Sequence, residues 1–281
     1  MKKNINISMI IVALNSENYI VNAIQSLIKQ GFPKDLFEII LVDGNSSDRT
    51  VELGRGVLKK NDINYQILNN EKKILSIGWN IGLKAAIGEY VIRIDAHSEL
   101  MPGYVESGLN KLKSNTRLAG IGGIIETVSN SYIGKRIAIV LSSKIAVGNS
   151  LFRVGVKMDT ISDTAVYAVY RKNACQSVGL LDEKLQRNQD LDFHKKLRAN
   201  GYLLMTSPDM KAVYFSRSSV QKFIKQAFNN GFWVINSKGF YLRHLAPLFF
   251  MLTSIFLIFL SNEYFLIYIT IYFMTIFLFF L

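Results

Sequence analysis

Three stretches of the sequence place carboxylates or an imidazole where they could bind a ligand or carry out chemistry. The stretch 42–48 contains Asp43, which could accept hydrogen bonds from a nucleobase or a ribose, followed by a Gly/Ser turn. In the stretch 93–97, Asp95 and His97 stand two residues apart. On an extended strand they would face the same side and could bind one divalent cation. The stretch 188–192 contains two carboxylates, one of which could act as a general base.

Each stretch also has an ordinary structural interpretation. An isolated Asp before a turn most often caps that turn, and acidic residues in the first turn of a helix favour the helix dipole. An acid-x-His triplet is by default part of a solvated loop. Position strengthens the ligand interpretation, because Asp43 and Asp95 each end an apolar run. Open α/β sheets bind ligands at the carboxyl ends of their strands.

An α/β sheet is the framework that must position these residues. In the first third of the chain, short runs rich in Ile and Val alternate with helix-like segments. Near-continuous apolar runs predict parallel strands that helices cover on both faces. The expected strands are Ile7–Leu14, Phe37–Asp43, Asn64–Leu68 and Tyr90–Asp95, and the expected helices are Asn18–Gln30, Asp48–Lys60 and Ile74–Ile87.

The middle of the chain gives a less regular pattern. Its Gly-interrupted and apolar runs predict two more strands, and its polar–apolar periodicity predicts three more helices, the last of them amphipathic. Residues 129–163 have no assignable structure. The expected strands are Leu118–Thr127 and Ala165–Tyr170, and the expected helices are Met101–Ser114, Gln189–Asn200 and Ser219–Lys238.

Charged and apolar residues are separated along the chain. The 281 residues include 33 Lys and Arg and 21 Asp and Glu, a net charge of +12, but Glu263 is the only charged residue after His244. We therefore expect a basic domain followed by a membrane-associated tail. Its two apolar segments are Leu245–Ser261 and Tyr264–Leu281. Each is about 17–18 residues long, near the lower limit for a transmembrane helix. An interfacial hairpin and one long imperfect span remain alternatives.

Several functional classes are excluded or disfavoured. A single cysteine, Cys175, excludes a disulfide framework and a Cys-based zinc site. A dinucleotide-binding fold would need Gly-x-Gly-x-x-Gly after the first strand, where the chain has Asn15-Ser16-Glu17-Asn18. The basic charge would suit a nucleic-acid binder, but carboxylates at strand ends would repel phosphate unless metal were bound. We therefore expect no nucleic-acid partner.

The ordered motifs resemble those of the family 2 glycosyltransferases, and most of all the ExoA-type enzymes of succinoglycan and other bacterial exopolysaccharide biosynthesis. The motifs are Val12–Glu17, Val42–Thr50, Asp95–His97 and Gln189–Asp192. The resemblance implies a GT-A fold, a Rossmann-like mixed α/β sheet. Its domain would cover residues 1–240, with a nucleotide-sugar half at 1–100 and an acceptor half at 101–240, before a hydrophobic tail at 241–281.

The resemblance also implies an activity. The chain would be an inverting, metal-dependent hexosyltransferase of exopolysaccharide or capsule biosynthesis, which uses a nucleotide sugar, most simply a UDP-sugar. Residues 171–243 carry 13 Lys and Arg against 5 Asp and Glu. Such a region suits an anionic leaflet and a polyprenyl-diphosphate-linked saccharide acceptor. Lys238, Arg243 and His244 precede the tail, so the positive-inside rule places the domain on the cytoplasmic side of the cell membrane.

Site residues follow from the resemblance position by position. Asp190 matches the general base, with Asp192 and Lys196 as supporting neighbours. Asp95 and His97 would hold Mn²⁺ or Mg²⁺. The remaining matches would contact the nucleotide, and these are Ala13, Asn15, Glu17, Asp43, Ser46 and Asp95.

Three positions depart from the family pattern, and the first is Ala13, which stands where the family often has Pro. His97 replaces the last Asp of the metal motif, and Trp79 stands where an Arg is common. A neutral imidazole can still bind a metal ion. Trp79 cannot make the contact to the diphosphate or ribose that an Arg would make at this position. A catalytically degenerate, membrane-tethered nucleotide-sugar-binding protein therefore remains the alternative.

Overall fold

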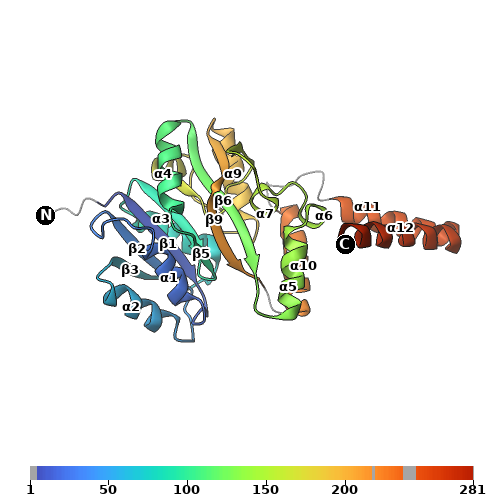
Figure 1. Cartoon of the computed structure of the whole chain (residues 1–281), viewed down its shortest axis with the longest axis horizontal. Helices are drawn as coiled ribbons and strands as arrows, with labels where there is room; N and C mark the ends of the chain where they lie inside the picture. Colours follow the sequence, from blue (N-terminus) through green and yellow to red (C-terminus); the bar gives the residue numbers. More distant parts are fainter. Residues whose placement is uncertain (1–4, 217–218, 237–244, 281) are drawn as a thin grey trace. The chain divides into compact units, whose positions relative to one another are not determined.

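The chain divides into two units, which the computed structural model describes over residues 5–216, 219–236 and 245–280. The first unit is Met1–Lys238 and contains the sheet, and the second is Gly239–Leu281 and contains two helices (Figure 1). Residues 237–244 lie outside the described part. The basic residues Lys238, Arg243 and His244, on which the sequence-based orientation relies, are therefore not described.

A mixed sheet forms the centre of the first unit, with nine strands among the described residues (Figure 1). Its order is β3-β2-β1-β4-β8-β6-β9-β5, and β7 pairs with β9. The strands from β3 to β4 are parallel, whereas β8 runs antiparallel to β4 and β6. The strands are β1 Ile7–Ala13, β2 Phe37–Asp43, β3 Asn64–Asn69, β4 Tyr90–Asp95, β5 Ser98–Leu100, β6 Leu118–Val128, β7 Thr160–Ile161, β8 Val169–Arg171 and β9 Leu203–Phe215.

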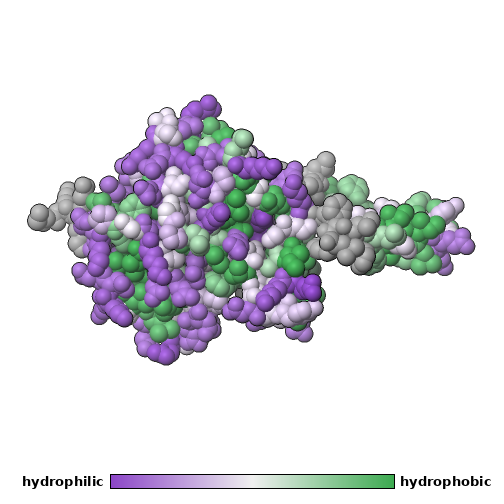
Figure 2. All heavy atoms as spheres, in the orientation of Figure 1, coloured by the Kyte–Doolittle hydropathy of each residue, from purple (hydrophilic) through white to green (hydrophobic). Residues whose placement is uncertain are grey.

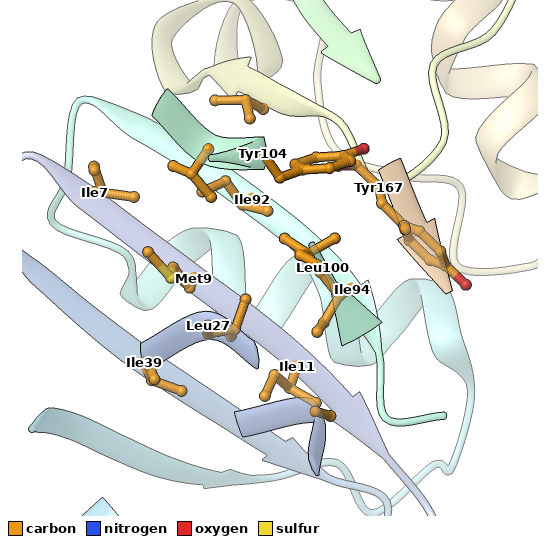
Figure 3. Packing of buried hydrophobic residues seen from close by; sticks show 14 of the residues in the cluster. Ile7, Met9, Ile11, Leu27, Ile39, Ile92, Ile94, Leu100, Tyr104 and Tyr167 are labelled. Atoms are coloured by element: carbon orange, nitrogen blue, oxygen red, sulfur yellow. The ribbon is translucent and has the colours of Figure 1, made fainter. Parts of the chain in front are cut away.

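Helices cover both faces of the parallel half, because its strands are apolar on both sides. Along β1, Met9 and Ile11 belong to the core under α1, α2 and α4, whereas Ile10 belongs to the opposite core under α3, α8 and α9. Figure 3 shows the first core, in which Leu27 of α1 lies near Met9 and Ile11. The helices are α1 Ile20–Ile28, α2 Thr50–Lys60, α3 Leu75–Ala85, α4 Tyr104–Ser114, α8 Lys172–Ser177 and α9 Gln189–Ala199.

The sequence-based assignment is accurate in the first third and weaker in the middle. The four expected N-terminal strands and three helices are present with ends shifted by a few residues. The expected strand Ala165–Tyr170 is wrong in extent, because only Val169–Arg171 pairs in the sheet. The unassigned residues 129–163 contain three helices and a two-residue strand, namely α5 Tyr132–Ser142, α6 Lys144–Val147, α7 Leu151–Val154 and β7.

The second unit consists of two apolar helices, α11 Ala246–Leu260 and α12 Asn262–Phe280. They contact each other through Phe250, whose ring centroid lies 5.4 Å from that of Tyr268 and 4.5 Å from that of Tyr272. Their outer surface is hydrophobic, in contrast to the mainly hydrophilic surface of the first unit (Figure 2). Among the described residues, no helix combines the length and apolar character that crossing a bilayer requires. The expectation of membrane-spanning helices therefore finds no support.

Candidate active site

The strand register brings two of the carboxylates to one edge of the sheet. Ala13, at the end of β1, pairs with Asp43 at the end of β2, and Val12 pairs with Asp95 at the end of β4. Because these strands are parallel, Asp43 and Asp95 flank the end of β1. This edge is the place where open α/β sheets bind their ligands.

Asp43 forms a turn with the residues that follow it. Its carboxylate accepts hydrogen bonds from the Ser46 amide at 2.9 Å and from the Ser46 hydroxyl at 2.6 Å. The side chain is almost completely buried. Turn formation, the ordinary interpretation of an isolated Asp, is therefore part of its role. A contact between Asp43 or Ser46 and a nucleotide stays a prediction.

The loops after β1 and β2 bind each other through Asn15 and Glu17. Asn15 has a positive φ of 47°. Its backbone N–H donates to the Ser46 hydroxyl, and its side-chain oxygen accepts from the backbone N–H of Ser47, both at 2.9 Å. The Glu17 carboxylate accepts a 3.2 Å hydrogen bond from the Arg49 amide at the start of α2. The predicted nucleotide-contacting residues thus form one pre-organised pair of loops, although their role toward a nucleotide stays a prediction.

Asp95 and His97 do not lie on one continuous strand. β4 ends at Asp95, and residues 96–97 form a turn before β5. The extended-strand argument for placing both side chains on the same side is therefore wrong. The His97 ring packs edge-on against Tyr214, with ring centroids 5.1 Å apart. The Tyr167 hydroxyl lies 3.4 Å from the Asp95 carboxylate, to which it donates.

Arg93 connects Asp95 with the predicted base Asp190. Its guanidinium forms an ion pair with Asp190, in the first turn of α9, and lies 3.5 Å from the Asp95 carboxylate. Only 12% of the Arg93 side chain is exposed, compared with 38% of Asp190. Burial by itself lowers the pKa of Arg93, but the negative charges of Asp190 and Asp95 outweigh it and raise that pKa. Arg93 therefore remains a cation, and it brings the start of α9 to the end of β4.

Asp192 and Lys196 lie on a different side of α9 from the Arg93 contact. The Asp192 side chain is buried, and its carboxylate lies 2.9 Å from the Lys196 ammonium group one turn later. This ion pair lies within α9. This ion pair can stabilise α9 without any part in catalysis. The predicted role of Asp192 and Lys196 as supporting neighbours of Asp190 stays a prediction.

The donor groups at the end of β4 fit a divalent cation that a substrate helps to bind. Among the described residues, no three His, Cys, Asp or Glu side chains gather into a complete cation site. The hydrogen bonds of the Asp95 carboxylate to described residues are long, at 3.4 and 3.5 Å, so its oxygens keep capacity for a cation. Mg²⁺ in phosphate-transfer sites typically uses one or two carboxylates and takes its other ligands from phosphate and water. Asp95 matches that partial donor set, whereas the imidazole of His97 suits a transition metal better than Mg²⁺.

Sequence reasoning missed Arg93 and two buried residues near it. The signal for Arg93 was available, because a cation inside the apolar run 90–95 requires an anionic partner when that run is buried. The Tyr170 hydroxyl and the His194 Nε2 atom are 2.7 Å apart in the core. Burial lowers the pKa of His194 to about 4, so its imidazole is neutral at neutral pH. No local pattern in the sequence distinguishes this pair from other core residues.

Comparison with known proteins identifies the family. Residues 8–179 match the model of "Glycosyl transferase family 2". The chain is 32% identical over 231 residues to a Methanococcus voltae protein, "Dolichyl N-acetyl-alpha-D-glucosaminyl phosphate 3-beta-D-2,3-diacetamido-2,3-dideoxy-beta-D-glucuronosyltransferase". This match covers 80% of the chain and 71% of that protein. The chain is 28% identical over 227 residues to the succinoglycan biosynthesis protein ExoA of Rhizobium meliloti. That match covers 79% of the chain and 67% of ExoA.

Solved structures support the GT-A-like fold. The first 349 residues of TarS from Staphylococcus aureus superpose with a TM-score of 0.59 at 21% identity, covering 83% of this chain and 66% of that one. A Pyrobaculum calidifontis mannosyltransferase bound to GDP-Man and Mn²⁺ gives 0.61 at 15% identity, covering 87% and 64%. The expected α/β mixed-sheet fold is confirmed. The chain belongs to glycosyl transferase family 2 and is a glycosyltransferase.

Proposed function

We propose that this glycosyltransferase is an inverting, metal-dependent enzyme that moves a sugar from a UDP-sugar to a polyprenyl-diphosphate-linked saccharide. It would act in exopolysaccharide or capsule biosynthesis, on the cytoplasmic side of the cell membrane. The observation that carries the proposal is the contact of Arg93 with both Asp190 and Asp95. This contact joins a carboxylate suited to general base catalysis to the strand edge where a nucleotide diphosphate would bind.

The proposed reaction is a single displacement at the anomeric carbon of the donor sugar. Asp190 takes the proton of the acceptor hydroxyl while the hydroxyl oxygen attacks and the bond to the nucleoside diphosphate breaks. Attack from the face opposite the leaving group inverts the anomeric configuration. A positioned base typically contributes about 10²–10⁴ in rate. Arg93 fixes the position of Asp190, because its guanidinium is buried and forms an ion pair with that carboxylate.

Asp95 and His97 are the residues that would hold the cation, either Mn²⁺ or Mg²⁺. When bound, the cation would neutralise charge on the departing diphosphate. The interlocked loops at Asn15, Glu17 and Asp43 would position the nucleoside, since their mutual hydrogen bonds fix the backbone before a donor arrives. Ala13 and Ser46 would complete this nucleoside contact.

The nature of donor and acceptor is supported by the comparisons. TarS has been crystallised with UDP and with UDP-GlcNAc, and GalNAc-T7 with UDP, GalNAc and Mn²⁺. A Campylobacter jejuni relative, 36% identical over 106 residues, is named "GalNAc(5)-diNAcBac-PP-undecaprenol beta-1,3-glucosyltransferase". It covers 37% of this chain and 34% of that protein. A lipid-linked acceptor also agrees with the exposed apolar side chains of α11 and α12, which would associate with a membrane without spanning it.

Donor screening on the purified 281-residue chain tests the proposal. The chain, in mild detergent with Mn²⁺, is incubated with a panel of nucleotide sugars and an undecaprenyl-diphosphate-linked saccharide, and transfer and donor hydrolysis are measured. We expect turnover with one donor and a 10²–10⁴-fold lower kcat in Asp190→Asn. Asp62→Asn is the matched control, because Asp62 is exposed and its positive φ of 53° suits Asn.

The outcomes separate the proposal from its alternative. Unchanged turnover in Asp190→Asn would remove Asp190 from the mechanism. Saturable nucleotide-sugar binding without turnover of any donor would favour the catalytically degenerate binding protein. Retention of configuration in the product would contradict the single displacement.

A further inference from the structure

The helix α10, Val220–Asn236, exposes a row of large apolar side chains. Its large apolar residues recur every four positions and therefore lie along one side of the helix. All four are exposed by half or more, with values of 50% for Val220, 61% for Ile224, 71% for Phe228 and 55% for Phe232. We call these four residues the α10 stripe. A surface helix of a globular domain normally turns such a stripe toward the core.

The opposite side of α10 carries its less exposed residues, which include the aromatic Phe223 and Trp233 as well as polar groups. The Asn230 side-chain oxygen accepts a 3.2 Å hydrogen bond from Arg187, and its backbone oxygen accepts one of 3.2 Å from the Asn188 side chain. Gln226 and Asn229, on that side, are less exposed than the stripe. Hydrogen bonds to the segment immediately before α9 and the half-buried Phe223 and Trp233 thus lie on this side, and the α10 stripe is exposed on the other.

Positive charge accompanies the stripe. Lys222 and Lys225 are exposed on α10. Between Asp209 and Glu263 the sequence contains six Lys and Arg residues and no Asp or Glu. A protein partner or a second copy of this domain would have to neutralise this charge with an acidic surface. A membrane that contains anionic lipids offers both an apolar interior and a negative surface.

We propose that α10 is an interfacial helix that lies on an anionic membrane, with the α10 stripe inserted between the lipids and Lys222 and Lys225 among the head groups. An exposed apolar stripe beside lysines, on a helix without acidic residues, is the pattern of helices that bind membranes in this way. The α10 stripe belongs to the first unit of the chain, whereas α11 and α12 belong to the second.

The position of α10 gives the membrane contact a consequence for the active site. Asn188, which donates to α10, is two residues before Asp190. A helix seated on the lipid surface would hold the start of α9, and with it the proposed base, close to the membrane. This consequence depends on the proposed function. The binding of α10 to lipid does not depend on it, and its test uses no substrate.

A fluorescent label on α10 tests the proposal in the 281-residue chain. Cys175, the only cysteine in the sequence, is buried, so a thiol-reactive nitrobenzoxadiazole dye would label Phe228→Cys selectively. Lys59→Cys, on the exposed side of α2, is the matched control. The label reports its own surroundings, and thereby distinguishes insertion of α10 from attachment through α11 and α12.

We expect blue-shifted, several-fold brighter emission from the label at position 228 with phosphatidylglycerol-containing vesicles, and little change with phosphatidylcholine vesicles or at position 59. Adding Ile224→Gln should reduce the change. Adding Lys222→Gln and Lys225→Gln should raise the lipid concentration for the half-maximal change up to about 30-fold, since each lysine near an anionic surface contributes about a factor of 5.

Two results would overturn the proposal. One is emission from position 228 that does not respond to phosphatidylglycerol vesicles although the chain sediments with them. The other is a spectral change that depends on protein concentration without lipid, which would assign the stripe to contacts between copies of the chain. In both cases transfer activity could be intact, so a failure here is distinguishable from a failure of the proposed function.

Discussion

Removing either partner of the Arg93–Asp190 ion pair should affect stability unequally, because the partners differ in burial. Asp190→Asn leaves the guanidinium of Arg93 only 12% exposed, with Asp95 at 3.5 Å as its remaining anionic partner. The buried Nε atom of Arg93 also has no hydrogen-bond partner within the described part of the chain. Arg93→Met instead removes the buried charge, retains most of the apolar stem, and leaves Asp190 with 38% of its side chain exposed.

The expected energies follow from that asymmetry. Breaking a buried pair costs about 3–5 kcal/mol when a charge remains buried. Because Asp95 still faces Arg93, we expect about 3 kcal/mol for Asp190→Asn, at the low end. For Arg93→Met we expect about 1 kcal/mol, since water can hydrate the remaining carboxylate. The double variant has no unpaired buried charge and should be about as stable as Arg93→Met.

Urea unfolding of the four proteins in one detergent, followed by circular dichroism, measures these differences. The coupling would appear as a double variant that is clearly more stable than Asp190→Asn alone. Strictly additive effects, or an Asp190→Asn variant at least as stable as Arg93→Met, would refute the inference that Arg93 depends on Asp190. The double variant also serves the activity test, because loss of turnover in it cannot be attributed to a destabilising buried charge.

Three further predictions concern burial, packing and the cation. In the unfolded chain His194 has its ordinary pKa of 6.5, whereas burial lowers the pKa in the folded chain to about 4. Between these two values the unfolded chain binds the proton more tightly. The free energy of unfolding should therefore fall by about 3 kcal/mol as pH drops from 6.5 to 4. His194→Gln should lack this part of the pH dependence. Gly123→Ala should destabilise by about 3 kcal/mol, because its Cβ would lie 1.9 Å from the backbone oxygen of Met210. The control, Gly56→Ala in α2, meets nothing within 4 Å and should stabilise by up to about 1 kcal/mol in thermal unfolding. Calorimetric titration should show that Mn²⁺ strengthens UDP binding by the wild type, and a similar gain in Asp95→Ala would exclude Asp95 as a ligand.

The first third of the chain was predictable because the signals for its strands and helices are local. Parallel strands buried on both faces require near-continuous apolar runs, and Ile7–Ala13 and Phe37–Asp43 show them. The short strand Val169–Arg171 has no comparable pattern. It exists because β4 and β6, both distant in the chain, offer backbone partners on its two sides. The extent of a strand that depends on such partners cannot be read from its own residues.

The candidate site was predictable to the level of residue type and sheet edge. Strand ends identified Asp43 and Asp95, and parallel strands necessarily bring such ends together. The extended-chain argument failed at His97, because a turn at residues 96–97 breaks the two-residue alternation of a strand. Whether these residues bind a nucleotide or a metal ion stays a prediction.

The sequence by itself determined which segments of the parallel half form strands and which form helices. It also determined the family motifs and the segregation of charge from the apolar tail. These depend on residue type and local spacing. Tertiary structure decided the pairing of Arg93 with Asp190, which are 97 residues apart, because α9 packs on the sheet through Phe193 and Leu197. It also decided that α10 turns its apolar stripe outward. Amphipathic spacing shows that a helix has two faces, but only its tertiary contacts, such as the hydrogen bonds at Asn230, show which face lies against the domain.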